Sequence, residues 1–184
     1  MRNVRIVLGL LVLGAFVAST ALAAEEVAHK YVGAAKCKMC HNAAAKGAQF
    51  KVWSESAHAK AFTVLASDEA KKIGKEKGIA DPQKDAKCLK CHVTGHGKAA
   101  AMFEASFKAE DGVGCESCHG AGKDYMPMPV MKAIKAGKTA AASVGLVKPT
   151  EKECVVCHNS ESPTFKAFDF KAAAAKIAHP YPKS

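Results

Sequence analysis

The polar and apolar positions after residue 24 predict short amphipathic helices joined by loops. In the clearest case His58, Phe62 and Leu65 recur at i, i+4 and i+7, so a helix over residues 54–66 would carry this histidine on its apolar face. Alanine-rich sequence favours helix through residues 37–51 as well. The pattern therefore predicts a mainly α-helical protein.

Capping signals place further helix boundaries. Ser67 is a good N-cap, Asp81 followed by Pro82 is a typical helix start, and Thr150 with Glu153 forms a capping box. Helices are predicted over residues 37–51, 54 or 56 to 66, 67 to 74 or 78, 81–95, 129–137, 150–158 and 170–178, with a short strand near 102–107.

All eight cysteines fall into four Cys-x-x-Cys-His motifs, which is the attachment signature of c-type haem. Two thiols at this spacing reach two vinyl groups on one porphyrin edge, and the next imidazole ligates the iron. Zinc ribbons and dithiol redox sites do not require a histidine after every second cysteine. We therefore predict four covalently bound haem c groups. The motifs consist of Cys37, Cys40 and His41; Cys88, Cys91 and His92; Cys115, Cys118 and His119; and Cys154, Cys157 and His158.

The other four histidines equal the number of second axial positions. His58 and His179, which follows the last predicted helix, are the best candidates. His96 lies four residues after His92, too near to reach the far face of its own haem, so it either serves another haem or lies at the surface. His29 either ligates a haem iron in this molecule, ligates one in a neighbouring molecule, or does neither. Methionine can also ligate haem iron, although it more often packs. The candidates of this type are Met126, Met128 and Met131.

The N-terminus has the form of a secretory signal peptide. Arg2 and Arg5 precede an apolar stretch over residues 6–17, and residues 21–23 form a small-x-small cleavage site. We expect a signal peptide over 1–23, a single tetrahaem domain over 24–184, and export to the periplasm. An uncleaved anchor is the alternative.

The formal net charge of +10 would fall to +8 with loss of Arg2 and Arg5, since residues 1–23 hold no acidic residue. A basic balance is compatible with nucleic-acid binding. Haem propionates offer a simpler account, so no nucleic-acid partner is predicted. Roughly 40 mature residues per haem cannot build an ordinary core. We therefore predict long haem-wrapping loops and a largely unfolded apoprotein.

Several segments resemble the cytochrome c554 family of tetrahaem cytochromes over most of the mature chain. They are residues 31–33, Trp53, 56–61, 91–95 and 112–120, of which the last is the most specific. The resemblance implies a mainly helical, exported electron-transfer protein organised around closely stacked haems, with axial ligands at His58 and His179.

This chain departs from the family pattern after the third motif. The family's type protein has a ligand histidine there, whereas residues 120–131 contain none. The second ligand of one haem iron must therefore come from elsewhere in the chain, from His29, His96 or a methionine. The type protein also leaves the haem of the second motif open on its distal side.

Three functions follow from these features. The first is a periplasmic electron carrier between redox proteins, and the apparent supply of ligands favours it over an enzyme. The second is an enzyme that reduces a small nitrogen oxide or oxidises hydroxylamine at an open haem. The third is a subunit of a conducting filament, in which His29 would ligate a neighbour's haem. The residues do not specify the donor or the acceptor.

Overall fold

The computed structural model describes residues 28–180, so the predicted signal peptide lies outside the described residues. The α-helices in this range are α1 Ala34–His41, α2 Gln49–Glu55, α3 Asp68–Glu76, α4 Ala86–His92, α5 Cys115–His119, α6 Met128–Lys135, α7 Glu151–Val155 and α8 Phe170–Ile177. Five short 3₁₀ helices lie among them, at Ala44–Lys46, Thr63–Ala66, Ala100–Met102, Ala109–Asp111 and Ala141–Val144. The β structure within 28–180 is one isolated bridge between Tyr31 and Phe103. The predicted mainly helical class is confirmed.

The predicted capping signals form as expected at two helices. The Ser67 side chain accepts a hydrogen bond from the Ala70 amide at 3.1 Å, which starts α3. The capping box of Thr150 and Glu153 is present at α7, which carries the fourth motif. Side chains next to the helix start thus satisfy amides that the first turn leaves unpaired.

The predictions for residues 37–51 and 54–66 were wrong about helix length. The first segment divides into α1, a 3₁₀ turn and α2, with a left-handed residue at Ala48 (φ 46°). The second is not an α-helix, because α2 ends at Glu55 and turns follow as far as the 3₁₀ helix at 63–66. The His58 carbonyl accepts the amide of Val113 as well as that of Ala61, both at 3.1 Å. A long-range contact thus overrides the local helical pattern, and His58 lies in a turn.

Three other boundaries differ from the predictions. The Asp81 carboxylate caps a turn by accepting from the Gln83 amide, so α4 begins later, with Asp85 as its N-cap. Helix α4 also ends before the predicted residue 95, because Val93 is extended. The predicted strand near 102–107 is reduced to the bridge at Phe103. The remaining predicted helices agree with α6, α7 and α8 to within a few residues.

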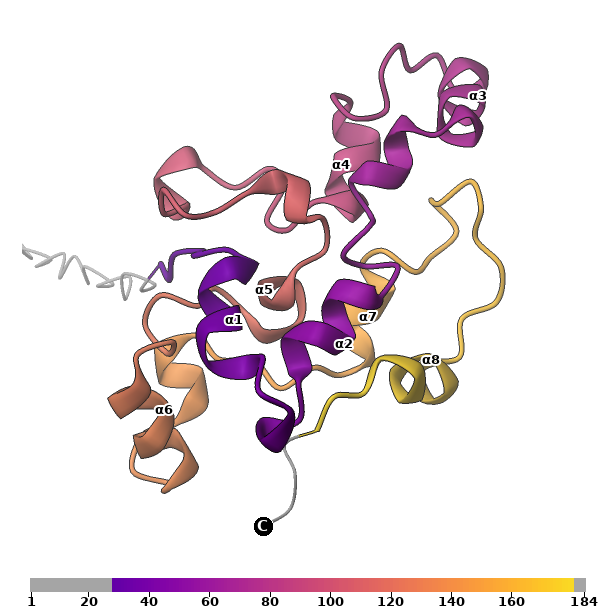
Figure 1. Cartoon of the computed structure of the whole chain (residues 1–184). Helices are drawn as coiled ribbons and strands as arrows, with labels where there is room; N and C mark the ends of the chain where they lie inside the picture. Colours follow the sequence, from indigo (N-terminus) through magenta and orange to yellow (C-terminus); the bar gives the residue numbers. More distant parts are fainter. Residues whose placement is uncertain (1–27, 181–184) are drawn as a thin grey trace, which may run out of the picture.

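Helix α5, which carries the third motif, lies near the centre of the molecule (Figure 1) and contacts α1 and α7. Its buried Glu116, 4% exposed, accepts three backbone hydrogen bonds. The donors are the amides of Val32 at 2.9 Å, Gly33 at 2.8 Å and Gly122 at 2.6 Å. The carboxylate therefore ties the segment before α1 and the segment after α5 to the third motif.

Two further side chains fix the loop that leads into α5. The Trp53 indole donates to the Val113 carbonyl at 2.8 Å. The buried Thr94 hydroxyl donates to the Gly112 carbonyl at 2.9 Å and accepts from the Gly114 amide at 2.7 Å. Segments from α2 and from the end of α4 thus hold the third motif by polar contacts.

The apolar core is thin for a domain of this size. Eight hydrophobic residues are buried within the described chain, and no large side chain there is less than 2% exposed. Ordinary domains bury a much larger contiguous set. The buried residues are Val32, Ala34, Ala61, Leu65, Ile79, Val93, Ala121 and Tyr125. This shortage matches a chain whose interior is built partly by another apolar group.

Candidate haem-binding site

Each of the four motifs lies on or at the end of a short helix. The first, second and third motifs form the last turns of α1, α4 and α5, and the fourth runs from α7 into the turn that follows it. None of the eight cysteines forms a disulfide, and each is at least partly accessible. A two-residue gap on a helical turn brings both thiols of a pair to one side, as attachment along one porphyrin edge requires.

The motifs are arranged in two pairs. The thiol of Cys37 in the first motif contacts that of Cys115 in the third. The thiol of Cys91 in the second motif contacts that of Cys157 in the fourth. The contact between α5 and α7 joins the two pairs, which gives the spatial order first, third, fourth, second. Sequence order does not reveal this arrangement.

Most of the shifted thiols do not have the character of reactive thiolates. The exception is Cys115, whose pKa is lowered chiefly by the hydrogen bond with the Cys37 thiol. Burial, together with the neighbouring Cys91, raises the pKa of Cys157 to about 12. Burial also raises the pKa of Cys118. Catalytic and redox-active cysteines generally have lowered pKa values, so these thiols resemble structural or attachment groups. Within residues 28–180, no three His, Cys, Asp or Glu side chains are grouped as metal ligands.

Two proximal histidines each face a second histidine. The ring centroids of His58 and His158 are 6.0 Å apart, with an interplanar angle of 73°. Those of His119 and His179 are also 6.0 Å apart, at 70°. A metal–imidazole bond is about 2 Å long and the ring centre lies about 1 Å beyond the nitrogen, so opposed ligands of one metal have centroids about 6 Å apart. The spacing of both pairs therefore fits one iron between two imidazoles.

Hydrogen bonds orient several of these rings through Nδ1. The Nδ1 atoms of His92, His119 and His179 contact the carbonyls of Ala61 at 2.6 Å, Val147 at 3.3 Å and Ile177 at 2.7 Å. Since a carbonyl can only accept, each Nδ1 carries the proton and each Nε2 keeps a free lone pair. Metal-ligating histidines are commonly held in this way.

Burial also keeps two of the paired histidines neutral. The pKa of His58 is lowered by burial and, to a smaller extent, by His158. The pKa of His119 is likewise lowered, again chiefly by burial. A neutral imidazole is the form that ligates a metal, so both rings are in the required state at neutral pH.

The other candidate ligands occupy different environments. His29 is half-buried, and its Nδ1 lies 2.7 Å from a carboxylate oxygen of Asp124. His96 is exposed on the loop after α4. Met126, just before α6, is 37% exposed, and Met128, the first residue of α6, is 55% exposed. Met131 lies in the same helix. The structure thus gathers four of the proposed histidine ligands and leaves His96 at the surface.

A cavity of about 1040 Å³ lies between the second and fourth motifs. It is large even for a small-molecule pocket, and the cysteines and histidines of both motifs line it. A second cavity of about 420 Å³ lies on the α8 side of His58 and His158. Open apolar space beside paired thiols and imidazoles is what attached porphyrins require, so the residues present fit haem c.

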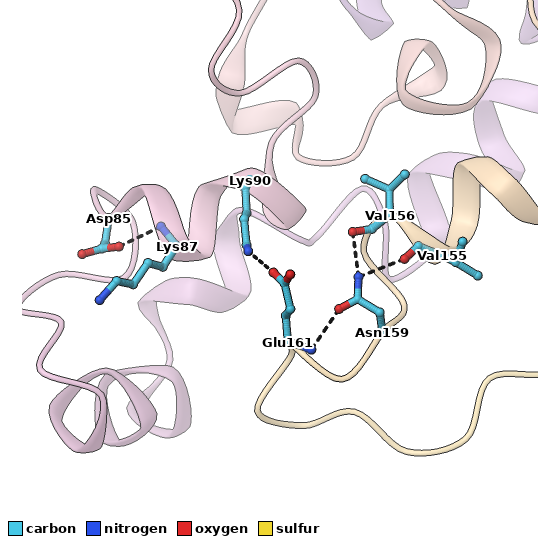
Figure 2. Close-up of polar contacts among 7 residues, drawn as sticks. All are labelled: Asp85, Lys87, Lys90, Val155, Val156, Asn159 and Glu161. Atoms are coloured by element: carbon cyan, nitrogen blue, oxygen red, sulfur yellow. Dashed lines mark hydrogen bonds and ion pairs between the residues drawn. The ribbon is translucent and has the colours of Figure 1, made fainter.

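Polar contacts connect the second motif with the loop that follows the fourth motif (Figure 2). Two of the residues involved, Lys90 and Glu161, line the larger cavity. Lys90, between the cysteines of the second motif, forms an ion pair with Glu161 on the loop after α7. This pairing raises the pKa of Lys90 and lowers that of Glu161. The Asn159 amide donates to the carbonyls of Val155 and Val156, both at 2.9 Å, and shapes the same loop.

Comparison with known proteins agrees with this geometry. Residues 36–120 match the model of a family described as cytochrome c554 and c-prime. Cytochrome c-554 of Nitrosomonas europaea is 40% identical over 100 residues, which are 52% of this chain and 40% of that protein. This part of the chain is similar to the cytochrome c554 family. A cytochrome c family implies covalently bound haem c. No solved structure matches the chain.

The cytochrome c554 match includes the first three motifs and His58, and it ends before the fourth motif and His179. The aligned part is well under two thirds of the relative's length. For the fourth motif and the C-terminal histidine, the support is therefore the ring geometry of this structure. Among the described residues, no helix has the length and apolarity to cross a bilayer.

Sequence reasoning missed three residues near these sites. Glu116 anchors the third motif, Asp124 contacts His29, and the Phe168 ring stacks on His158 with centroids 4.7 Å apart. Their partners lie between 6 and 95 residues away along the chain. One usable signal was present, because Glu116 is an acidic residue inside a haem motif flanked by glycines.

Proposed function

We propose that this chain is an exported tetrahaem c-type cytochrome that carries electrons between redox proteins of a respiratory chain. The proposal rests on one observation. In two places a histidine of a Cys-x-x-Cys-His motif faces a second histidine, at a distance that suits one iron between the two rings. Haem c supplies one-electron chemistry at its iron when bound. The chain would bind it through the eight motif cysteines, with His41, His92, His119 and His158 as proximal ligands.

We further propose that His58 is the second ligand at the fourth motif and His179 at the third. Two neutral imidazoles would hold the iron between them at each of these motifs and would exclude water and small ligands from it. Such a site changes little in structure between its two charge states, which suits a carrier. The proposed partners are proteins with accessible redox centres, and the proposed location is the periplasm.

The mass and visible spectrum of the purified protein test the cofactor content. The mature chain, cleaved after Ala23, is expected to weigh its polypeptide mass plus four haems and to show a strong Soret band. A chain that weighs only its amino acids, or that carries fewer than four haems, would contradict the proposal.

Removal of a second ligand should open one iron. His58→Ala and His179→Ala are each expected to convert one low-spin ferric haem to high spin, while His96→Ala, at an exposed position, should change nothing. Electron paramagnetic resonance measures this, and the near-perpendicular rings predict low-spin signals at unusually large g values in the unaltered protein. If all three variants keep the original spin state, the proposed ligand pairs are wrong.

The second motif favours a second candidate function, reaction with a small molecule such as a nitrogen oxide or hydroxylamine. Within the described residues His92 has no facing histidine ring, and the larger cavity lies beside it. That cavity is partly lined by Phe165 and Phe168. Azide added to the ferric protein distinguishes the two candidates. Conversion of one high-spin haem to low spin supports an open site, whereas an entirely low-spin protein that ignores azide supports a carrier alone.

A further inference from the structure

A carboxylate holds the ring of His29. Its Nδ1 lies 2.7 Å from Oδ2 of Asp124, and the two side chains are 20% and 45% exposed. Because an ionised carboxylate can only accept, Nδ1 carries the proton, and in the neutral imidazole Nε2 keeps a free lone pair. His92, His119 and His179 are held in the same way, but by uncharged carbonyls. His29 is therefore prepared as a ligand and differs from the others in having a charged partner.

The backbone on both sides of this contact is fixed. The Lys123 amide donates to the Lys30 carbonyl at 3.0 Å, directly beside His29 and Asp124. The next residues on both segments are bound to the buried carboxylate of Glu116, through the amides of Val32 and Gly122. Two segments about 95 residues apart are thus joined by several bonds, so the histidine–carboxylate contact is part of the folded structure.

The ring of His29 lies on the His119 side of the junction between the first and third motifs. It packs on Gly145, where an added Cβ would lie 2.6 Å from the ring and where φ is 78°. Two residues on, the Val147 amide donates to the His119 carbonyl at 2.9 Å. Since the thiols of Cys37 and Cys115 are in contact, His29 adjoins the place where the first and third haems would meet.

The first motif needs a second ligand, and His29 is the available one. His58 faces His158 and His179 faces His119, so within residues 28–180 the proximal histidines without a facing ring are His41 and His92. Tyr31 on the same segment reaches Gly95 after α4, but the His29 ring itself packs on Gly145 beside the third motif. His29 is also only twelve positions before His41. The location of His29 therefore matches the first motif.

We propose that His29 is the second axial ligand of the haem at the first motif and that Asp124 positions it. This inference rests on the proposed function, since it requires haem at Cys37 and Cys40. A carboxylate behind an axial histidine raises its basicity and stabilises the ferric state. Asp124 thereby lowers the reduction potential of the first haem and favours it as the strongest electron donor among the haems with two histidine ligands.

The ligand assignment is tested by His29→Ala in the intact holoprotein. One additional high-spin ferric haem is expected by paramagnetic resonance, and added imidazole should return it to low spin, which shows that the site is otherwise folded. The molecular mass should still report four haems. An unchanged spin state overturns the assignment, whereas a missing haem in the unaltered protein would instead contradict the proposed function. A shift from dimer to monomer in the variant would place His29 on a neighbouring molecule and also overturn the assignment.

The role of Asp124 is tested by potentials, with Asp124→Asn and Asp68→Asn as a matched pair. Both remove one carboxylate, but Asp68 is fully exposed at the start of α3. Groups that hydrogen-bond to a metal-ligating histidine change metal binding about 10- to 100-fold. Because Asp124 is half exposed, we expect the lower limit of this range. A tenfold change in the equilibrium constant corresponds to a shift of about 59 mV in a one-electron reduction potential. Spectroelectrochemistry should show that the reduction potential of one haem rises by that amount in Asp124→Asn and returns to its original value in Asp124→Glu. Every haem that was low-spin before should remain low-spin. Equal potentials in the two asparagine variants would overturn the role of Asp124.

Discussion

Replacing both cysteines of the third motif, Cys115→Ala with Cys118→Ala, is expected to remove one haem and to unfold most of the protein. Helix α5 lies at the centre and contacts α1 and α7 (Figure 1), while the buried apolar side chains are few. A bound group that is present only in the folded state contributes its binding free energy to stability. A loss above about 5 kcal/mol would equal the whole stability of many domains.

This result is measured by mass, by the Soret absorbance per chain and by far-ultraviolet circular dichroism. The matched change at the fourth motif, Cys154→Ala with Cys157→Ala, should also remove one haem but leave more helix, because α7 lies at the side of α5. An unchanged mass in the third-motif variant would show that no haem is attached there. Equal helix content in the two variants would contradict the central role of α5.

Glu116→Gln is expected to cause the largest loss of stability among changes that leave every haem motif intact. The carboxylate is 4% exposed and accepts from three amides at 2.6 to 2.9 Å. A glutamine can place one oxygen toward these donors, but its NH₂ group must then face another N–H. A buried donor without a partner costs about 1–3 kcal/mol, and the lost charge weakens the remaining bonds. We expect a total of about 3 kcal/mol.

Guanidinium unfolding of the holoprotein, followed by circular dichroism, measures this loss. Glu110→Gln is the matched control, because it makes the same chemical change at an exposed position in the 3₁₀ helix before α5. The control should unfold at the original midpoint. If the two variants unfold alike, Glu116 does not anchor the segments around the third motif.

Local sequence sufficed for the helical class, for the haem motifs and for several helix ends. The Cys-x-x-Cys-His spacing is chemically specific, and Ser67 and Thr150 cap their helices through contacts within three residues. Such interactions do not depend on the rest of the fold. Periodicity failed at His58, where an apparent helix gives way to turns because its carbonyl is bound by the distant Val113 amide.

For the second haem ligands too, the sequence supplied the candidates and the tertiary structure distinguished them. Counting histidines indicated that His29, His58, His96 and His179 could complete four sites, but the count could not distinguish them. Tertiary structure opposes His58 to His158 and His179 to His119, places His96 at the surface, and brings Asp124 to His29. None of these contacts is local, so no pattern of neighbouring residues encodes it.

By itself, the sequence determined what kind of chemistry this chain can hold, since thiol spacing and adjacent imidazoles are covalent facts of the polypeptide. Only the tertiary structure decided which motifs lie together, which imidazoles face one another and which carboxylates support them. The physical reason is range. Attachment and capping act within a few residues, whereas opposition of two rings across a cavity requires segments between about 60 and 100 residues apart to be folded against each other.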